Sequence, residues 1–208
     1  VNGTANGTGI KLIRNDIIAA LLSQKISNNS IVIDPRSSKI IEETFKGRII
    51  KSPVGHVNMK STMRKYDAAF GSELSGHFYF REFHYADNAL LAALYVTKIL
   101  SESSKKISEL VKPFQKYYST GEINFKIKNK YQVIKNIKNS IKGYKKLEEI
   151  DGIAFYFDDY WFIVRKSNTE DLLRLIVEAN TKEKMLKVVK DMKKLINKRL
   201  WNKKTPIN

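Results

Sequence analysis

The chain has 208 residues, of which 42% are hydrophobic and 11% aromatic, enough for one large or two modest folded domains. It contains no cysteine, which excludes a disulfide scaffold and any metal site with cysteine ligands. No apolar run approaches the ~20 residues that cross a bilayer, and the first residues lack the basic and apolar regions of a secretory signal. We therefore expect a cytoplasmic protein without a membrane partner.

The chain carries a formal net charge of +17. A strongly basic balance is typical of proteins that bind nucleic acid or another polyanion. The alternative, which the spacing favours, is a lysine-rich surface with no such role, because the lysines are spread along the chain and mixed with acidic residues. A small anionic ligand is compatible with either interpretation.

The first half of the chain alternates helix and strand patterns. In chain order these patterns predict a helix over 14–26, a strand over 31–34, a strand within 47–53, a helix over 58–66, a strand over 67–73 and a helix over 86–103. Pro35 ends the first strand, and Ser37 or Ser38 can cap a helix that follows it. Such close alternation favours an α/β layer fold with a partly parallel sheet.

The pattern changes near Ser101, where a polar and then amphipathic stretch interrupted by Pro113 predicts a linker helix. After Gly121 the patterns predict a strand over 123–128, a helix over 131–142, strands over 152–158, 160–165 and 172–180, and a helix over 181–200. This order favours a mostly antiparallel sheet with two helices on one face.

The fold class expected from these elements is α/β. We expect a three-layer α/β domain with a mixed sheet over residues 1–104 and a linker helix over 105–120. An α+β domain over 121–208 follows, with a four-stranded, mostly antiparallel sheet and two helices.

The stretch "GSELSGHFYFREFHYADN" places Glu73, Ser75 and His77 at alternate positions. If the stretch is extended, these three side chains point the same way. A carboxylate, a hydroxyl and an imidazole facing one spot would suit a ligand rich in hydroxyls, such as a sugar. Gly71 and Gly76 would let the backbone approach that ligand closely. The alternative is an ordinary loop with polar turn residues.

A second candidate site lies in "VRKSNTE", which joins two predicted strands. Arg165 offers a planar fork of donors that suits a phosphate. Ser167, Asn168 and Thr169 add short donors, and the N–H groups of a turn can form an anion nest. The alternative is a polar hairpin turn, because these residue types are common in turns.

Two further candidates, Arg36 and His56, each follow a predicted strand, so they could line a cleft at one edge of the sheet. The alternative for each is a solvated loop residue. The sequence has no Walker loop, no G-x-G-x-x-G, no G-x-S-x-G and no H-E-x-x-H motif.

In their order along the chain, these motifs resemble the carboxy-terminal half of the α-D-phosphohexomutase family, in particular its phosphomannomutase/phosphoglucomutase branch. The segment "GSELSGHFYF" is similar to the family's sugar-binding loop, G-E-x-S-G-H. "VRKSNTEDLLRLIVEA" is similar to its phosphate-binding loop, R-x-S-N-T-x-P, and "SPVGHVNMKSTM" to the G-H segment of its third domain. The resemblance runs from about Ile10 to the final helix.

The resemblance implies the third and fourth domains of the family, preceded by a remnant of the second. It implies an isomerase-class activity that interconverts hexose 1-phosphate and hexose 6-phosphate, with Mg²⁺ and a hexose 1,6-bisphosphate as cofactors. It assigns three residues to the sugar: Glu73, Ser75 and His77. It assigns the phosphate to Arg165, Ser167, Asn168 and Thr169, and places His56 and Arg36 beside the reacting groups.

The chain also departs from the family. It has no stretch like T-A-S-H-N, which carries the phosphoserine, and none like D-G-D-x-D-R, which binds Mg²⁺. It carries Lys166 and Asp171 where prolines are common in the phosphate loop, and Ser72 in place of a usual glycine. We expect no activity from this chain alone, the family's amino-terminal domains as partners, and exposed faces that could support a homodimer. The alternative is a non-catalytic basic module that binds nucleic acid or another polyanion.

Overall fold

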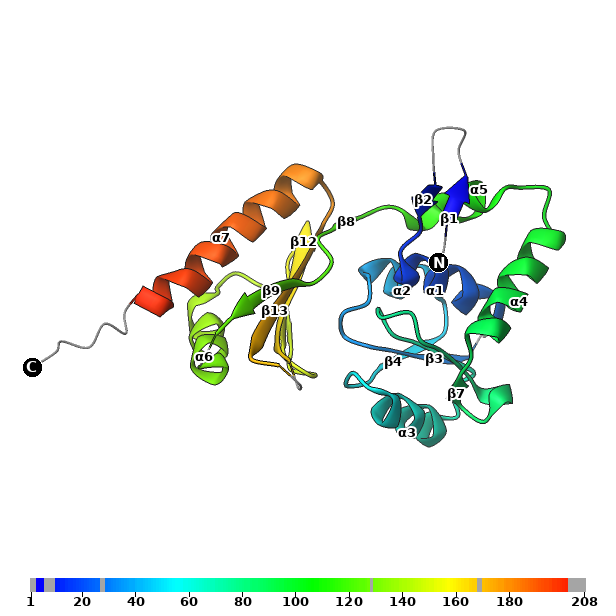
Figure 1. Cartoon of the computed structure of the whole chain (residues 1–208), viewed down its shortest axis with the longest axis horizontal. Coiled ribbons are helices and arrows are strands. Elements are labelled where there is room, and N and C mark those ends of the chain that lie inside the picture. The colour runs from blue at the N-terminus through cyan, green and yellow to red at the C-terminus, as the bar shows by residue number, and fades with distance from the viewer. Residues whose placement is uncertain (1–2, 6–9, 27–28, 128, 168–169, 202–208) are drawn as a thin grey trace, which may run out of the picture. The chain divides into compact units, whose positions relative to one another are not determined.

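The computed structural model describes residues 3–5, 10–26, 29–127, 129–167 and 170–201. The chain divides into two compact units, residues 1–116 and 117–208, and each is described by itself (Figure 1). No described helix is both long and apolar enough to cross a membrane.

The first unit contains short helices around a mixed sheet. Its strands are β1 (Gly3–Ala5), β2 (Ile10–Leu12), β3 (Ser30–Ile33), β4 (Arg48–Lys51), β5 (Phe70–Ser72), β6 (Phe78–Phe80) and β7 (Ala86–Asp87). Its helices are α1 (Asn15–Ile26), α2 (Lys39–Thr44), α3 (His56–Tyr66), α4 (Ala89–Ser101) and α5 (Ile107–Val111), with 3₁₀ turns η1 (Arg81–Phe83) and η2 (Lys112–Phe114).

The main sheet has the strand order β4-β3-β5-β6-β7, and β1 pairs with β2 apart from it. Strand β3 runs parallel to both β4 and β5, whereas β6 and β7 are antiparallel to their neighbours. The expected mixed sheet is therefore confirmed. Its carboxyl edge gathers the ends of β3, β4 and β5, from which the candidate residues follow.

Helix α3 packs on one face of this sheet and α1 and α2 lie on the other (Figure 1). Under α3, Met59 and Met63 are fully buried against Val32 and Tyr79. On the opposite face Phe80 stacks on Tyr95 of α4, with ring centroids 5.6 Å apart. These layers confirm the expected three-layer α/β domain.

Local capping explains where the helices begin. The Ser38 side chain accepts a hydrogen bond from the N–H of Ile40, so Ser38 caps α2 as one of the two expected residues. Helix α3 begins at His56, two residues before its expected start, after Gly55 turns the chain with a φ of 116°. His56 is therefore the first residue of α3 instead of a loop residue.

The second unit is an antiparallel sheet with two helices. Its strands are β8 (Tyr118–Ser119), β9 (Ile123–Lys126), β10 (Lys146–Glu148), β11 (Ile153–Tyr156), β12 (Tyr160–Lys166) and β13 (Leu172–Ala179). Its helices are α6 (Lys130–Ser140) and α7 (Lys182–Trp201). The order is β10-β11-β12-β13, and both β8 and β9 pair with β13.

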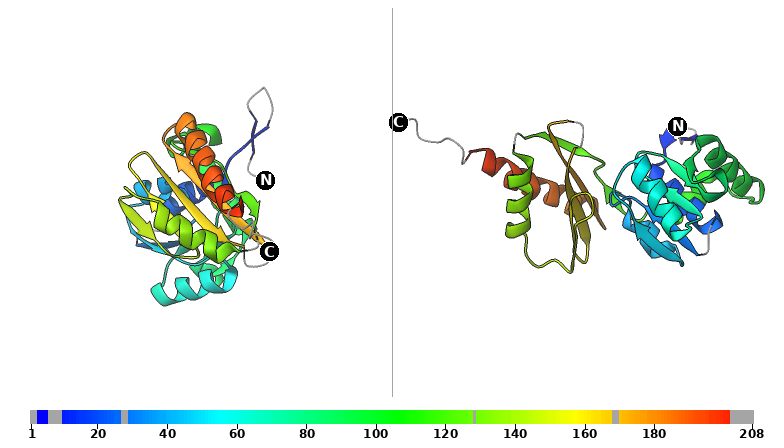
Figure 2. Two further views of the ribbon diagram at one scale, coloured as in Figure 1. Left: turned by 90° about the vertical axis from the view of Figure 1, so that its left-hand side faces the viewer. Right: turned by 90° about the horizontal axis from the view of Figure 1, so that it is seen from below.

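Both helices cover one face of this sheet, as expected, and Figure 2 shows them in front of it in the left-hand view. The core between them is built from apolar side chains of the strands, of α6 (Val133, Ile137) and of α7 (Val188, Val189, Met192, Ile196). Within the described residues this sheet has six strands, whereas the sequence predicted four. The two strands that were not predicted, β8 and β10, are only two and three residues long. Strands this short leave almost no periodic signal.

Candidate functional site

The segment from Glu73 to His77 is a tight hairpin turn between β5 and β6. The N–H of Gly76 donates to the carbonyl of Glu73 at 2.9 Å, and the N–H of Glu73 donates to the carbonyl of His77 at 2.9 Å. The expectation of an extended segment with three side chains on one face is therefore wrong. Glu73 and His77 come together because the turn closes on itself.

Two features of the neighbouring chain hold this turn. Gly76 has a φ of 95°, and a Cβ there would lie 2.8 Å from the side-chain nitrogen of Asn15. That amide of Asn15 donates to the carbonyl of Leu74 at 3.1 Å. The first turn of α1 thus fixes the turn that carries the candidate sugar-binding residues.

Glu73 is a buried carboxylate with two neutral hydrogen-bond donors. Its side chain is only 3% exposed. The N–H of Gly55 donates to Oε1 at 2.7 Å, and the hydroxyl of Tyr79 donates to Oε2 at 2.8 Å. Burial and the hydrogen bond to Glu73 raise the pKa of Tyr79 well above its usual value, so this hydroxyl keeps its proton. Glu73 therefore ties the turn to the start of α3.

Asp87 lies between the two histidines. Nδ1 of His56 is 3.3 Å from one oxygen of Asp87, and Nδ1 of His77 is 3.1 Å from the other. The two rings meet edge to face with centroids 4.3 Å apart. Burial alone would raise the pKa of Asp87, but the hydrogen bond with His77 and the charge of His56 outweigh it and lower that pKa. Asp87 thus fixes both imidazoles.

We call His56, Glu73, His77 and Asp87 the histidine cluster. One ring nitrogen of His56, one of His77 and one oxygen of Glu73 lie within 4.8 Å of one another. The sequence predicted three of its members but gave Asp87 no role. Asp87 joins the cluster because β6 pairs with β7, which places Asp87 opposite Tyr79 and near His77.

The other two candidate residues of the first unit, Ser75 and Arg36, are not members of the histidine cluster. Ser75 is exposed at the tip of the turn and makes no side-chain hydrogen bond within the described part of the chain. Arg36 is buried against Asp34, and its Nε and Nη2 donate hydrogen bonds to the Asp34 carboxylate at 3.1 and 2.7 Å. The same Asp34 accepts from the N–H of Leu74 at 2.8 Å. Arg36 is thus connected to the turn through Asp34, for which the sequence predicted no role.

In the second unit, Arg165 is the next-to-last residue of β12, and its side chain is buried among acids. Its Nε and Nη2 donate to Asp151 at 3.1 and 2.9 Å, and its Nη1 lies 3.6 Å from Glu122. Gly152, at a φ of 142°, allows the close packing, because a Cβ there would lie 2.7 Å from the carbonyl oxygen of Val164. No sequence motif indicated either acid.

The other residues of the candidate phosphate loop are only partly described. Ser167 is buried, and its hydroxyl accepts from the N–H of Glu170 at 3.2 Å. Asn168 and Thr169 lie outside the described residues. Asp171 is exposed and paired with Lys130 at 3.2 Å, which partly neutralises its charge.

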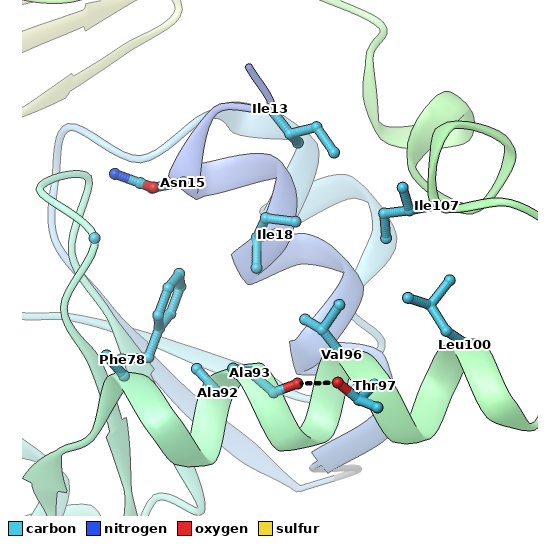
Figure 3. A pocket seen from close by; sticks show the side chains of 12 residues that line it. Ile13, Asn15, Ile18, Phe78, Ala92, Ala93, Val96, Thr97, Leu100 and Ile107 are labelled. Atoms are coloured by element: carbon cyan, nitrogen blue, oxygen red, sulfur yellow. Dashed lines mark hydrogen bonds between the residues drawn. The ribbon is translucent and has the colours of Figure 1, made fainter. Parts of the chain in front are cut away.

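A separate hollow of about 460 Å³ lies between α1, α4 and α5. Figure 3 shows apolar side chains pointing into it, among them Ile18, Val96, Leu100 and Ile107. Its few polar groups include Asn15 and the hydroxyl of Thr97, which is already bonded to the carbonyl of Ala93 at 2.9 Å. This lining does not suit a sugar phosphate, which needs several polar partners.

Comparison with known families gives two matches that together cover most of the chain. Residues 14–117 match the model of phosphoglucomutase/phosphomannomutase alpha/beta/alpha domain III. Residues 122–195 match the model of the phosphoglucomutase/phosphomannomutase C-terminal domain. The two matches follow the same order along the chain as the two units of the structure.

Individual relatives agree. A phosphomannomutase from Methanocaldococcus jannaschii is 44% identical over 194 residues, which cover 90% of this chain and 43% of the relative. A phosphomannomutase from Vibrio cholerae is 35% identical over 88% of this chain and 41% of its own length. A phosphoglucomutase/phosphomannomutase family structure from Burkholderia thailandensis superposes on 93% of this chain and 43% of its own, with a TM-score of 0.78 and 22% identity. The chain thus spans less than half the length of these relatives.

Proposed function

Since the chain belongs to the phosphoglucomutase/phosphomannomutase family, of which it carries domain III and the C-terminal domain, we propose that it binds a hexose phosphate. It would act as the substrate-binding half of a phosphohexomutase that interconverts hexose 1-phosphate and hexose 6-phosphate. One observation carries this proposal: the hairpin turn holds Glu73 beside His56 and His77.

The histidine cluster has the chemistry of a sugar site. Glu73 is fixed by two donors, and its oxygens keep lone pairs that can accept from sugar hydroxyls. Asp87 engages Nδ1 of His56 and of His77, which leaves Nε2 of each ring for a hydroxyl. Ser75, exposed at the tip of the turn, adds a rotatable donor. Fixed groups of this kind bind without reorganising, which favours affinity.

Arg165 has the chemistry of a phosphate ligand. A guanidinium has five N–H donors, and Asp151 takes two of them at hydrogen-bond distance. The acids fix the plane of the guanidinium, and the remaining donors can bind a phosphate oxygen. We assign Ser167, Asn168 and Thr169 to the same phosphate, following the family motif.

Turnover would need groups that these 208 residues do not supply. The chain has neither the T-A-S-H-N-like nor the D-G-D-x-D-R-like stretch of the family. The histidine cluster does not fit the family's Mg²⁺, because two imidazoles stand where this ion prefers oxygen ligands. We therefore propose that the 208-residue polypeptide is inactive alone and works with the family's other domains.

Exposed Leu90 and Leu94 on α4 offer apolar surface for such a domain or for a second copy of the chain.

The test is calorimetric titration of the chain with glucose 1-phosphate, inorganic phosphate and a short DNA duplex at two salt concentrations. Saturable binding of the phosphosugar, tighter than that of phosphate and weakly dependent on salt, supports the proposal. Binding to DNA alone, lost at the higher salt, would instead indicate a polyanion module, because many phosphate contacts give a steep salt dependence. A coupled mutase assay on the same sample should show no turnover.

A further inference from the structure

The histidine cluster combines groups that bind transition metals. Its ligand atoms come from His56, His77 and Glu73 and lie within 4.8 Å of one another. Two imidazoles and one carboxylate are a ligand set that suits Zn²⁺, Co²⁺ or Ni²⁺. Three protein ligands also leave a coordination position open for water or another ligand. The set is poorly suited to Mg²⁺, which prefers oxygen.

The charges in the cluster favour a bound cation. Glu73 is 3% exposed, and both of its donors, Gly55 and Tyr79, are neutral. Asp87 contacts only the imidazoles of His56 and His77 among ionisable partners in the described part of the chain. A buried carboxylate without a lysine or arginine partner is costly. A divalent ion bound at Glu73 would neutralise its charge.

The imidazoles are also positioned before any ion arrives. The two oxygens of Asp87 hold the rings of His56 and His77 at 3.3 and 3.1 Å. Histidines that bind metals are commonly held by such a carboxylate, which fixes the ring and makes it a stronger base. Little conformational freedom would remain to be lost on binding.

We propose that the histidine cluster is a binding site for a divalent transition-metal ion, best matched by Zn²⁺. His56, Glu73 and His77 are the ligands, and Asp87 positions the two imidazoles. The inference rests on the geometry and charge of the cluster and not on the proposed sugar phosphate. Because both ligands would use the same side chains, Zn²⁺ and a hexose phosphate should exclude each other.

The experiment is calorimetric titration of the metal-free chain with Zn²⁺ at neutral pH, with Mg²⁺ at the same concentration as a comparison. We expect one saturable Zn²⁺ site that a chelator reverses, and no site for Mg²⁺. Co²⁺ bound in place of Zn²⁺ should give the visible absorption of a site with nitrogen ligands. A folded chain that shows no saturable Zn²⁺ binding would overturn the proposal.

Variants identify the ligands. His56→Ala and His77→Ala change side chains that are 44% and 41% exposed, so the fold should survive. Each should weaken Zn²⁺ binding by at least about tenfold, and Asp87→Asn by about tenfold. The matched control is His84→Asn, because His84 is the third histidine of the chain and lies outside the cluster. Its φ of 53° is one that asparagine tolerates.

Equal losses in His84→Asn and the cluster variants, or no loss in His56→Ala and His77→Ala, would indicate adventitious binding and overturn the assignment. The titration with glucose 1-phosphate is done without metal, so it measures sugar-phosphate binding independently of Zn²⁺ binding. Failure of the metal site therefore leaves the proposed function untouched, and failure of the sugar site leaves the metal site untouched.

Discussion

Arg165 is paired with acids before any anion binds. Asp151 and Glu122 hold its guanidinium, and its side chain is only 4% exposed. The same acids that fix the fork also repel a phosphate, so the site combines good geometry with an opposing charge. If Arg165 binds the phosphate as proposed, this balance predicts weak binding of free phosphate.

Removing the guanidinium should weaken phosphosugar binding. We expect Arg165→Ala to lose about 1.5–3 kcal/mol of binding free energy for glucose 1-phosphate, the range for hydrogen bonds to charged groups. Arg165→Lys keeps the charge but not the planar fork of donors, so its affinity for glucose 1-phosphate should lie between those of Arg165→Ala and the wild type. Calorimetry measures both, with thermal unfolding to check the fold. Arg48→Ala, which changes a guanidinium 5.0 Å from the ring of Tyr66, is the control. Unchanged affinity in Arg165→Ala would remove the phosphate role from this residue.

Neutralising Glu73 should separate the sugar from the phosphate. We expect Glu73→Gln to weaken binding of glucose 1-phosphate by about 1–3 kcal/mol. Binding of inorganic phosphate should be unaffected, because in the proposed function Glu73 contacts the sugar hydroxyls and not the phosphate. Glu82→Gln, at an exposed carboxylate bonded to Tyr95, is the matched control. Equal losses for both ligands would mean that Glu73 serves the fold, through Gly55 and Tyr79, and not the ligand.

At this scale the sequence predicted residue types better than contacts. Glu73 and His77 stood out by their spacing at alternate positions, yet they come together because a turn closes and not because the segment is extended. Asp87 and Asp151 were missed, because their roles depend on strand pairing and on the turn before β11. A sequence shows which groups are available, whereas pairing partners far apart in the chain become visible only in the fold.

Among the elements, the turn before β11 packs closely against the backbone of β12 beside Arg165. We expect Gly152→Ala to destabilise the protein by about 2–4 kcal/mol, because a Cβ would meet the Val164 carbonyl at 2.7 Å on a backbone with a φ of 142°. Gly143→Ala is the matched control, since its φ is 72° but no atom lies within 4 Å of the new Cβ. It should lose only about 1–2 kcal/mol. Chemical denaturation measures both, and equal losses would mean that the clash is relieved by movement.

Helix α4 is fastened to the sheet by Tyr95, which stacks on Phe80 and donates to Glu82. The hydrogen bond to Glu82, with burial and the charge of Glu82, raises the pKa of Tyr95 to about 12. A raised pKa means that the folded state holds the proton more tightly than the unfolded state does. The stability gained is therefore complete below pH ~10 and is lost as the pH rises towards 12.

We expect wild type to lose on the order of 1 kcal/mol more than Tyr95→Phe between pH ~9 and pH ~11, after allowance for solvent screening. Urea unfolding at the two pH values measures the difference. Tyr118→Phe, at a half-exposed tyrosine of the second unit, should keep the full pH dependence of wild type. If the stability of wild type and of Tyr95→Phe changed equally with pH, ionisation of Tyr95 would not contribute to the stability of the fold.

The longer elements followed from periodicity alone. Helices α1, α4 and α7 and the strands β12 and β13 have enough residues for a clear pattern. The short strands β7, β8 and β10 do not, and they exist because a neighbouring strand offers unpaired backbone groups. Tertiary pairing, which no local pattern encodes, therefore decided the number of strands in the second sheet.

For the whole molecule, each unit has its own hydrophobic core. Among the described residues, the buried core of the second unit is built from side chains between Ile127 and Ile196, and partly buried neighbours such as Ile123 pack against it. The family match to the C-terminal domain, residues 122–195, covers almost the same range. A core that is complete within about 90 residues is in the range that folds independently.

We therefore expect a fragment of residues 117–208 to fold alone and to unfold in a single cooperative transition. Circular dichroism should show mixed helix and strand, and urea should give one transition that agrees between fluorescence and far-ultraviolet signals. Val164→Ala, in the middle of the core, should destabilise the fragment and the full chain by similar amounts, about 1–3 kcal/mol. A fragment without a cooperative transition would mean that the second unit depends on the first, and the proposed phosphate binding by Arg165 would then have to be measured in the full chain.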